Sequence, residues 1–548
     1  MAKKKSPIDP LDSPHYGLHG IIVTMTAEEA IVKGTLFIHA ARIEAIIPDG
    51  KPIPEALKNV PVYKTKGTIF PGLIELHNHL SYNCLPMWKV PKQYNNRSQW
   101  SGIPEYQLRI STPMKILGKA AGYVEAIVRY VECKCLAGGV TTSQGIMLFS
   151  NAGIQKYYRG IVRNVENTSD PDLPDVDARI PDIAAKEVEK FAAKLKKSSC
   201  LLLHLSEGRD DKARKHFEAL RLNGSDWAIG PSLAGIHCVA LKPGDFKIMQ
   251  QRGASMVWSP LSNLLLYGQT TDIKSAKASG ITIGLGSDWS PSGSKNLLGE
   301  LKVGKIYSDE NGSLFSDYEL VAMATKNAAS IIKWDKELGT LEPGKRADLL
   351  VISRQGRDHY RTLLTAAESQ IGLVVVNGAP RFGDGNIMLK FKGATEKRKV
   401  GNKFKHFNLQ QVTADPVVGK LKLSVAEQKL KKGLLNLRKE AEKQMGAFKI
   451  KNVRGASFLV PKKQAEWVLV LDHNEEEGQP LRTHFRIDGE PSMPMHKTAL
   501  TAVRPEDLVP IQLDPLTVAN DKEFFTKLKQ QMNLPPYIKN KLKKMYEG

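Results

Sequence analysis

The sequence predicts an α/β protein built around a (β/α)8 barrel, because polar residues recur at the ends of apolar runs along a long chain. The runs have the length and composition of buried strands, and they end on His77, His79, His204, His237 and Asp288. In a barrel of parallel strands, the carboxyl ends of all strands converge on one mouth. The 548 residues are enough to hold these positions in one large domain.

The segments on both sides of the barrel alternate apolar and polar residues, which is typical of strands joined by turns. The runs before the barrel are Gly20–Met25, Gly34–His39 and Arg42–Ile47, and those after it are Ala347–Ile352, Ile371–Gly378 and Ile387–Phe391. We therefore expect β-structure at both flanks of the barrel.

Beyond about Ala394 the pattern changes again. Ser424–Met445 has the apolar spacing of an amphipathic helix, strand-like runs follow at Ser457–Val460, Trp467–Leu471 and Thr483–Ile487, and the chain closes on a Lys-rich helical segment. We expect an extra basic α+β segment here, either as an appendage of its own or as a cover over the barrel. A chain that ends near Ala394 is then expected to keep a folded barrel.

Composition favours a cytoplasmic enzyme. The net charge is +22, but the basic residues form only short runs, which are more typical of a solvated surface than of a nucleic-acid site. No apolar stretch approaches the roughly 20 residues of a membrane span, and no apolar export segment follows the basic N-terminus. The chain has five cysteines, an odd number that cannot all pair within one chain, and we expect them to be reduced thiols. A homo-oligomer is compatible with this composition.

Neutral imidazoles together with a carboxylate suit zinc or ferrous iron, with one position left open for water. A single His at the end of a strand is more often a surface residue than a ligand. Several such residues in the same setting and in a coherent order favour a metal site.

Several segments carry a resemblance to a known family. They are Phe70–His79, His204–Glu207, Ile236–Cys238, Ser259–Asn263, Leu285–Asp288, Met323–Ala329 and Leu338–Leu349. In these segments and their order, the chain resembles the amidohydrolase superfamily, and more closely the branch of cytosine deaminase, guanine deaminase and the triazine hydrolases. The resemblance covers roughly residues 17 to 380.

The resemblance implies one divalent metal, zinc first and iron as the alternative, held by His77, His79, His204 and Asp288. Glu207 and His237 would assist proton transfer. It also implies a small composite β-sandwich from both flanks. The expected organisation is a basic tail at 1–16, the N-terminal part of the sandwich at 17–69, the barrel at 70–335, the C-terminal part of the sandwich at 336–394 and the extension at 395–548.

Some family members hold two metals, bridged by a carboxylated lysine on the fourth barrel strand. The candidate strand at 158–167 offers Arg163 and no lysine, which favours a single metal. This segment could be strand three or strand four, and no clear strand is found between Asn167 and Lys197.

The implied activity is hydrolysis of a carbon–nitrogen bond other than a peptide bond. A divalent metal supplies hydroxide, Asp288 takes the proton, Glu207 passes a proton to nitrogen, and His237 stabilises the developing oxyanion. Deamination of a heterocycle and opening of an amide or cyclic amide both remain open. The competing hypotheses are a catalytically retired barrel that serves as a binding module, and a polyanion-binding protein.

The long loop after His79 brings aromatic and basic residues near the mouth, where they would suit a small planar substrate. The alternative is that they only pack the loop against the barrel. Candidate substrate-binding residues in this loop and after other strands are Tyr82, Trp88, Arg97, Trp100, Gln144, Arg163, Asn164, Trp258 and Trp289.

Overall fold

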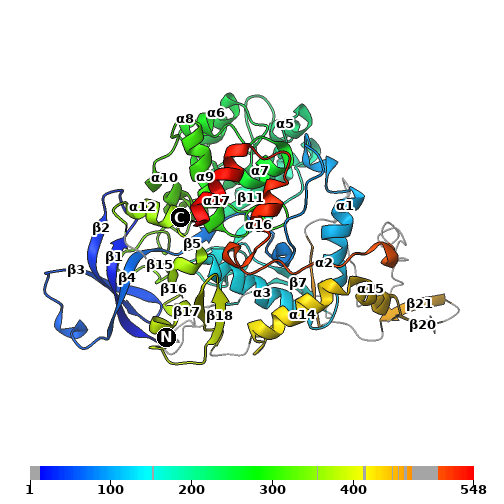
Figure 1. The fold of residues 1–548 in the computed structure, drawn as a ribbon. Coiled ribbons are helices and arrows are strands. Elements are labelled where there is room, and N and C mark those ends of the chain that lie inside the picture. The colour runs from blue at the N-terminus through cyan, green and yellow to red at the C-terminus, as the bar shows by residue number, and fades with distance from the viewer. Residues whose placement is uncertain are drawn as a thin grey trace.

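The computed structural model describes residues 13–547, apart from 151–153, 159, 354–355, 412–414, 447, 454–455, 462–465 and 472–503. Residues 1–12 of the expected basic tail and the strand-like run 483–487 lie outside the described residues. A barrel of parallel strands, wrapped by helices, stands beside a large mixed sheet (Figure 1). None of the described helices has the length and apolar character needed to cross a membrane.

Two parallel sheets supply the strands of the barrel. The first, with three strands, has the order β5-β6-β9, and the second, with five, runs from β10 to β14. Their bounds are β5 Leu73–Glu75, β6 Val140–Ser143, β9 Arg163–Asn164, β10 Val176–Arg179, β11 Cys200–Leu205, β12 Leu233–His237, β13 Ser255–Trp258 and β14 Thr282–Leu285.

Backbone contacts join the two sheets at both edges. The amide of Val176 donates to the carbonyl of Val165 at 2.9 Å, which links β9 to β10. Asn78 and Asp288 form a parallel bridge that links the ends of β5 and β14. The strands therefore close into an eight-membered ring in chain order. Leu202 and Ala234 pair across β11 and β12 on the face that also carries His204, and they belong to one buried apolar cluster.

The fourth strand is β10, which lies where the sequence showed no clear strand, between Asn167 and Lys197. The sequence-based prediction missed it because Val176–Arg179 has only four residues, two of them charged, between proline-containing loops. The uncertain segment at 158–167 holds β9, which is the third strand. The described residues between β6 and β10 contain no helix, and a hairpin of β7 (Met147–Ser150) and β8 (Gln155–Tyr157) stands there instead.

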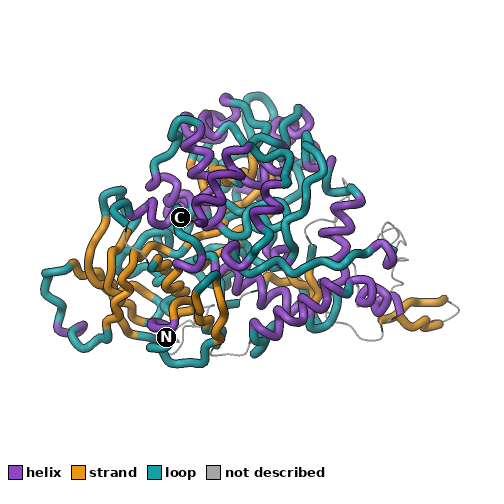
Figure 2. The backbone as a smooth tube through the Cα atoms, viewed as in Figure 1, coloured by secondary structure: helices purple, strands orange, loops and turns teal. Residues whose placement is uncertain are grey.

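Helices cover the outside of the barrel, as Figure 2 shows in purple. The longer ones are amphipathic or buried because they fill the space between the strands and the neighbouring elements. They are α3 Tyr123–Ala137, α4 Val188–Leu195, α5 Asp211–Glu218, α6 Pro243–Gln251, α7 Pro260–Tyr267, α8 Ile273–Ser279, α9 Leu297–Glu310, α10 Asp317–Met323, α11 Lys326–Ile331 and α12 His359–Leu364; α1 Pro104–Tyr106 and α2 Thr112–Leu117 lie in the long loop after β5.

Strands from both flanks pair in one sheet with nine strands, whereas the sequence predicted a composite sandwich that ends at residue 394. β4 joins the two halves by pairing with β15, and β18 and β19 extend the sheet past that boundary. The strands are β1 His15–Val23, β2 Ile31–His39, β3 Arg42–Pro48, β4 Val62–Pro71, β15 Leu349–Ile352, β16 Ile371–Val376, β17 Ala379–Asp384, β18 Glu396–Val400 and β19 Lys403–Phe407.

The C-terminal segment packs onto the barrel. The amphipathic run at 424–445 forms two helices, α14 Leu423–Leu435 and α15 Leu437–Gly446, which are followed by β20 Phe448–Val453, β21 Ala456–Pro461 and β22 Trp467–Leu469. β22 pairs with β7, and α14 packs on α3. Of the last two helices, α17 Pro536–Glu547 lies against α9, and α16 Phe524–Lys529 lies against α17. Of the two alternatives left open by the sequence, the described residues favour a cover over the barrel.

Candidate metal centre

Five buried side chains from four strand ends meet at the mouth of the barrel. His77 and His79 follow β5, His204 lies in β11, His237 ends β12, and Asp288 follows β14. All five are at most 7% exposed. The parallel ring explains the convergence, because it places the carboxyl ends of the strands at the same end of the barrel.

Four of these side chains surround one point. The Nε2 atom of His204 lies 3.1 Å from Nε2 of His77 and 3.3 Å from Nε2 of His79. Asp288 Oδ1 lies 3.6 Å from His77 Nε2 and 3.5 Å from His79 Nε2. Donors at about 2.1 Å from a tetrahedral zinc ion stand about 3.4 Å apart. The separations of these four donors are close to this spacing, so the donor set suits a divalent metal ion.

Burial favours the neutral form of two of the imidazoles. It lowers the pKa of His77 and of His204 well below the ordinary value, and the neighbouring histidines lower both further. A neutral imidazole has a free lone pair for a metal. Burial also raises the pKa of Asp288, although His79, His237 and the Ser262 hydroxyl oppose that shift.

A left-handed backbone conformation orients the side chains of His237 and Asp288. His237 has φ of 68° and Asp288 has φ of 63°, a region that residues other than glycine rarely adopt. Ala234 and Ile236 of β12 lie on the same face of the sheet as His204, so regular alternation would turn His237 away from the mouth. The left-handed turn at the strand end brings it back, and such strain is typical of functional sites.

The segment Ser259–Asn263, at the start of α7, holds three of the cluster residues in place. Ser259 Oγ lies 2.8 Å from His77 Nδ1, Ser262 donates to Asp288 Oδ2 at 2.5 Å, and Asn263 Nδ2 lies 2.8 Å from His237 Nδ1. In the sequence this segment contributes to the family resemblance, and no role was predicted for Ser259, Ser262 or Asn263. Their spacing along the chain could not show which side chains they contact.

Glu207 lies beside the cluster with one oxygen held and one facing the mouth. Tyr267 donates its hydroxyl to Oε1 at 2.7 Å, and Oε2 lies 3.8 Å from His237 Nε2 and 3.7 Å from the Arg97 guanidinium. Burial, and then the Glu207 charge, raise the pKa of Tyr267 well above its usual value, so its hydroxyl stays protonated. Tyr267 was not among the sequence-predicted site residues.

Aromatic side chains form a wall next to the cluster. The Trp289 ring meets the His79 ring edge to face at 5.5 Å and the Tyr82 ring at 5.1 Å. Tyr106, which the sequence analysis missed, lies in contact with Trp88 and Trp100. The Trp100 indole also donates to the Tyr267 hydroxyl at 3.0 Å. The loop after His79 thus both packs against the barrel and lines its mouth.

The remaining candidate substrate-binding residues contact protein groups outside the histidine cluster. Gln144 accepts a hydrogen bond from the amide of Asn78 at 2.9 Å, which places it next to the ligand-bearing segment. Arg163 forms a buried ion pair with Asp348 at 3.0 Å, just before β15 of the large sheet. Asn164 donates to a backbone carbonyl, and Trp258 packs against the Tyr307 ring of α9. The role of Arg163, Asn164 and Trp258 in substrate binding stays a prediction.

A comparison with protein families agrees with this geometry. Residues 184–381 match the model of the amidohydrolase family. The matched region runs from just before α4 into β17 and contains His204, Glu207, His237 and Asp288. This part of the chain is therefore similar to the amidohydrolase family.

Two curated proteins that the chain resembles are named 5-methylthioadenosine/S-adenosylhomocysteine deaminases. The protein of Symbiobacterium thermophilum is 31% identical over 188 residues, which are 32% of this chain and 42% of that protein. The protein of Thermoanaerobacter pseudethanolicus is 23% identical over 399 residues, which are 65% of this chain and 91% of that protein. The first alignment thus spans less than half of the relative's length.

Two solved structures share the fold of this chain. An adenosine deaminase from Xanthomonas campestris with bound zinc superposes with a TM-score of 0.55 at 13% identity, covering 78% of this chain and 98% of that one. An atrazine chlorohydrolase from Arthrobacter aurescens, complexed with zinc, has a TM-score of 0.52 at 19% identity, covering 67% and 94%. At such identities the likeness concerns the fold alone.

Proposed function

We propose that this protein is a metal-dependent hydrolase of carbon–nitrogen bonds other than peptide bonds, and that it deaminates a heterocycle. The observation that carries the proposal is the position of Glu207. It is a buried carboxylate outside the ligand set, with Oε2 facing His237 at 3.8 Å and Oε1 fixed by Tyr267. Such a group beside a metal cluster is suited to move a proton to or from substrate nitrogen.

Each side chain has a defined role in this proposal, and Asp288 has two. His77, His79, His204 and Asp288 would hold the metal, which when bound supplies hydroxide at neutral pH. Asp288 takes the proton of the attacking water. Glu207 delivers a proton to the ring or leaving nitrogen, and His237 stabilises negative charge on the oxygen that adds to carbon.

The wall of aromatic side chains supports a planar substrate. Trp289 stands against the metal-facing His79, with Tyr82 behind it, so a flat ring could lie beside Trp289 while its carbon faces the cluster. The two deaminases are named for adenosine derivatives, whose adenine ring is a planar heterocycle with an exocyclic amine. This favours deamination over the opening of an amide.

The experiment that tests the function is a screen of the zinc-loaded protein for ammonia release. For ammonia release, the panel contains 5-methylthioadenosine, S-adenosylhomocysteine, adenosine, guanine and amino-triazines. Hydantoins and N-acyl compounds are added as a second group, for which the release of acid is measured. Ammonia release that depends on metal and disappears in His204→Ala supports the proposal. Acid release from amides alone would contradict deamination, and inactivity of the metal-loaded protein on every class would contradict the enzyme assignment.

We expect the purified protein to hold about one zinc or iron ion per chain. Four donors converge on one point, and the fourth strand, β10, ends on Arg179 and has no lysine that could become a bridging ligand. Elemental analysis after dialysis measures the stoichiometry. Two tightly bound ions at the mouth of the barrel would contradict this prediction.

Tyr267→Phe is expected to lower turnover by about 10-fold or more, because a hydrogen bond to a charged group contributes about 1.5–3 kcal/mol. The ring and its packing are kept, and only the hydroxyl that holds Glu207 Oε1 is lost. Turnover and zinc content are measured together. Unchanged turnover would show that Glu207 needs no such support, and lost zinc would show that Tyr267 acts on the ligands instead.

A further inference from the structure

The C-terminal segment places a buried carboxylate, Asp514, between two buried lysines. Asp514 has no exposed side-chain surface, and Lys134 and Lys295 are 2% and 4% exposed. One carboxylate oxygen accepts a hydrogen bond from Lys134 of α3 and the other from Lys295, which precedes α9. The amide of Asp514 donates to the carbonyl of Cys84 at 3.0 Å. The segment thus reaches the loop that follows the metal-facing His79.

Lys134 continues this network toward both ligand-bearing loops. Its ammonium donates to the carbonyl of Asn83 at 2.8 Å and to the Ser290 hydroxyl at 2.8 Å. Asn83 follows His79, and Ser290 follows Asp288 by two residues. The Asn83 side chain then links the two loops, because it accepts from the amide of Ser290 at 2.7 Å and donates to Asn78 Oδ1 at 2.8 Å.

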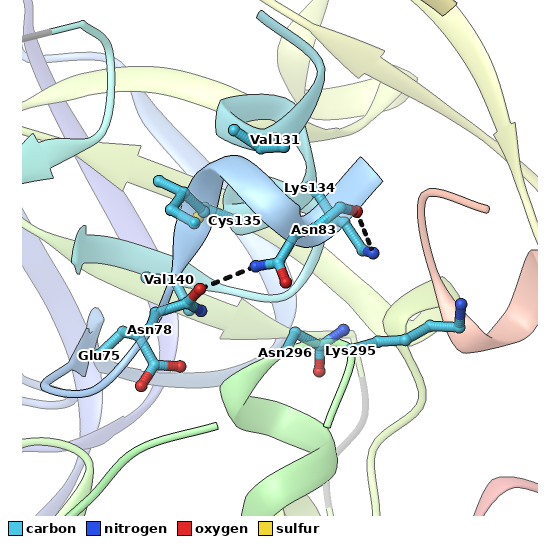
Figure 3. Close-up of a pocket in the computed structure, with 10 residues that line it drawn as sticks. Glu75, Asn78, Asn83, Val131, Lys134, Cys135, Val140, Lys295 and Asn296 are labelled. Atoms are coloured by element: carbon cyan, nitrogen blue, oxygen red, sulfur yellow. Dashed lines mark hydrogen bonds between the residues drawn. The ribbon is translucent and has the colours of Figure 1, made fainter. Parts of the chain in front are cut away.

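Asn78 is the residue between His77 and His79. A continuous path of hydrogen bonds therefore leads from Asp514 through Lys134 and Asn83 to the segment that carries two of the proposed ligands. Figure 3 shows Lys134, Asn83 and Asn78 lining one small cavity, with Lys295 across it. The path has no member in the large sheet, so it connects the C-terminal segment to the mouth directly.

The charges in this network are matched. Lys295 has a second partner, Asp521, at 2.9 Å, whereas Asp514 is the acidic partner that the described residues provide for Lys134. Burial lowers the pKa of Lys134, and the Asp514 charge opposes that shift. Without the carboxylate, the buried ammonium would face an uncompensated desolvation cost and could not hold its position between Asn83 and Ser290.

We propose that Asp514 is a positioning residue of the metal centre, which acts through Lys134 on the loops that carry His77, His79 and Asp288. The proposal rests on the proposed metal site and assigns the C-terminal segment a part in it. Outer partners of metal ligands fix the orientation of the ligands, and their loss typically lowers metal affinity by about 10–100-fold.

The test is zinc affinity in full-length protein, measured by competition with a chromophoric chelator at a temperature where every apo variant is folded. Asp514→Asn keeps the shape and removes the charge, and we expect it to bind zinc about 10–100-fold more weakly than the wild type. Asp521→Asn is the matched control, because it removes a buried acidic partner of Lys295 in the same segment and does not touch Lys134. We expect its zinc affinity to equal that of the wild type.

A second comparison separates positioning from general destabilisation. If Asp514 acts through Lys134, adding Asp514→Asn to Lys134→Met causes little further loss of zinc affinity. Ser290→Ala removes only an acceptor of Lys134, and we expect weaker zinc binding from it even if Asp514→Asn does not fold. Equal affinity in wild type and in these variants would overturn the positioning role alone. A wild-type protein that binds no zinc would overturn the proposed function itself.

Discussion

Glu207→Gln is expected to leave the metal content close to that of the wild type and to lower turnover by at least about 100-fold, the usual contribution of a general acid or base. The substitution keeps the size of the side chain and its hydrogen bond with Tyr267, and it removes the proton that the carboxyl group can exchange. Because Glu207 lies outside the set of four converging donors, its loss should not release the ion.

Asp288→Asn is the matched comparison for this variant. Asp288 Oδ1 lies 3.6 Å and 3.5 Å from two histidine nitrogens, so we expect this variant to lose both metal affinity and turnover. Kinetics and elemental analysis are carried out on both variants with the substrate found by the screen. Full activity of Glu207→Gln would remove Glu207 from the mechanism, and loss of its metal would show that Glu207 is a ligand.

A chain that ends at residue 503 is expected to lose the cooperative fold of the barrel at 37 °C. The deletion removes Asp514 and leaves Lys134 and Lys295 buried without it, and breaking a buried pair in this way costs about 3–5 kcal/mol. It also uncovers apolar surface, because side chains of this segment are buried against the barrel: Ile511, Leu513, Phe524, Leu528, Ile538 and Leu542. The free energy lost through the unpaired lysines and the exposed apolar side chains together is comparable with the free energy of unfolding of a typical domain, about 5–15 kcal/mol.

This expectation reverses the prediction from sequence that a chain ending near Ala394 keeps a folded barrel. Thermal and urea unfolding of the full-length and shortened proteins measure the difference. The control is the shortened chain with Lys134→Met and Lys295→Met, which should recover part of the lost stability if unpaired charge is a main cause. A shortened chain that unfolds at the same temperature as the full-length protein would show that the segment is dispensable.

The sequence by itself determined the fold class, the resemblance to the amidohydrolase family and the polar residues that converge at the mouth. This information is local in the sequence. An apolar run that ends in His77 or Asp288 predicts a buried strand, and it also places the polar residue at the carboxyl end of that strand. The single-metal expectation also rested on local information. The segment used for it proved to be the third strand, but the true fourth strand, β10, contains no lysine either.

The sequence left the position of β9 uncertain and did not predict β10, because the stability of such short strands comes from the neighbouring strands. β9 has two residues and β10 four, too few for a periodic pattern, and both exist because the closed ring supplies hydrogen-bond partners on each side. The extent of the large sheet was also undetermined, since β18 and β19 are charged strands whose place depends on pairing with β17.

Only the tertiary structure decided which polar residues support the site. Ser262, Asn263 and Tyr267 lie on one short helix, but their partners Asp288, His237 and Glu207 are 26, 26 and 60 residues away. Asp514 is 380 residues from Lys134. Hydrogen bonds and buried ion pairs depend on distance in space, which the local pattern of a chain does not contain. For the same reason the sequence could not show that Trp258 packs against Tyr307 of α9, or that Arg163 pairs with Asp348 just before β15.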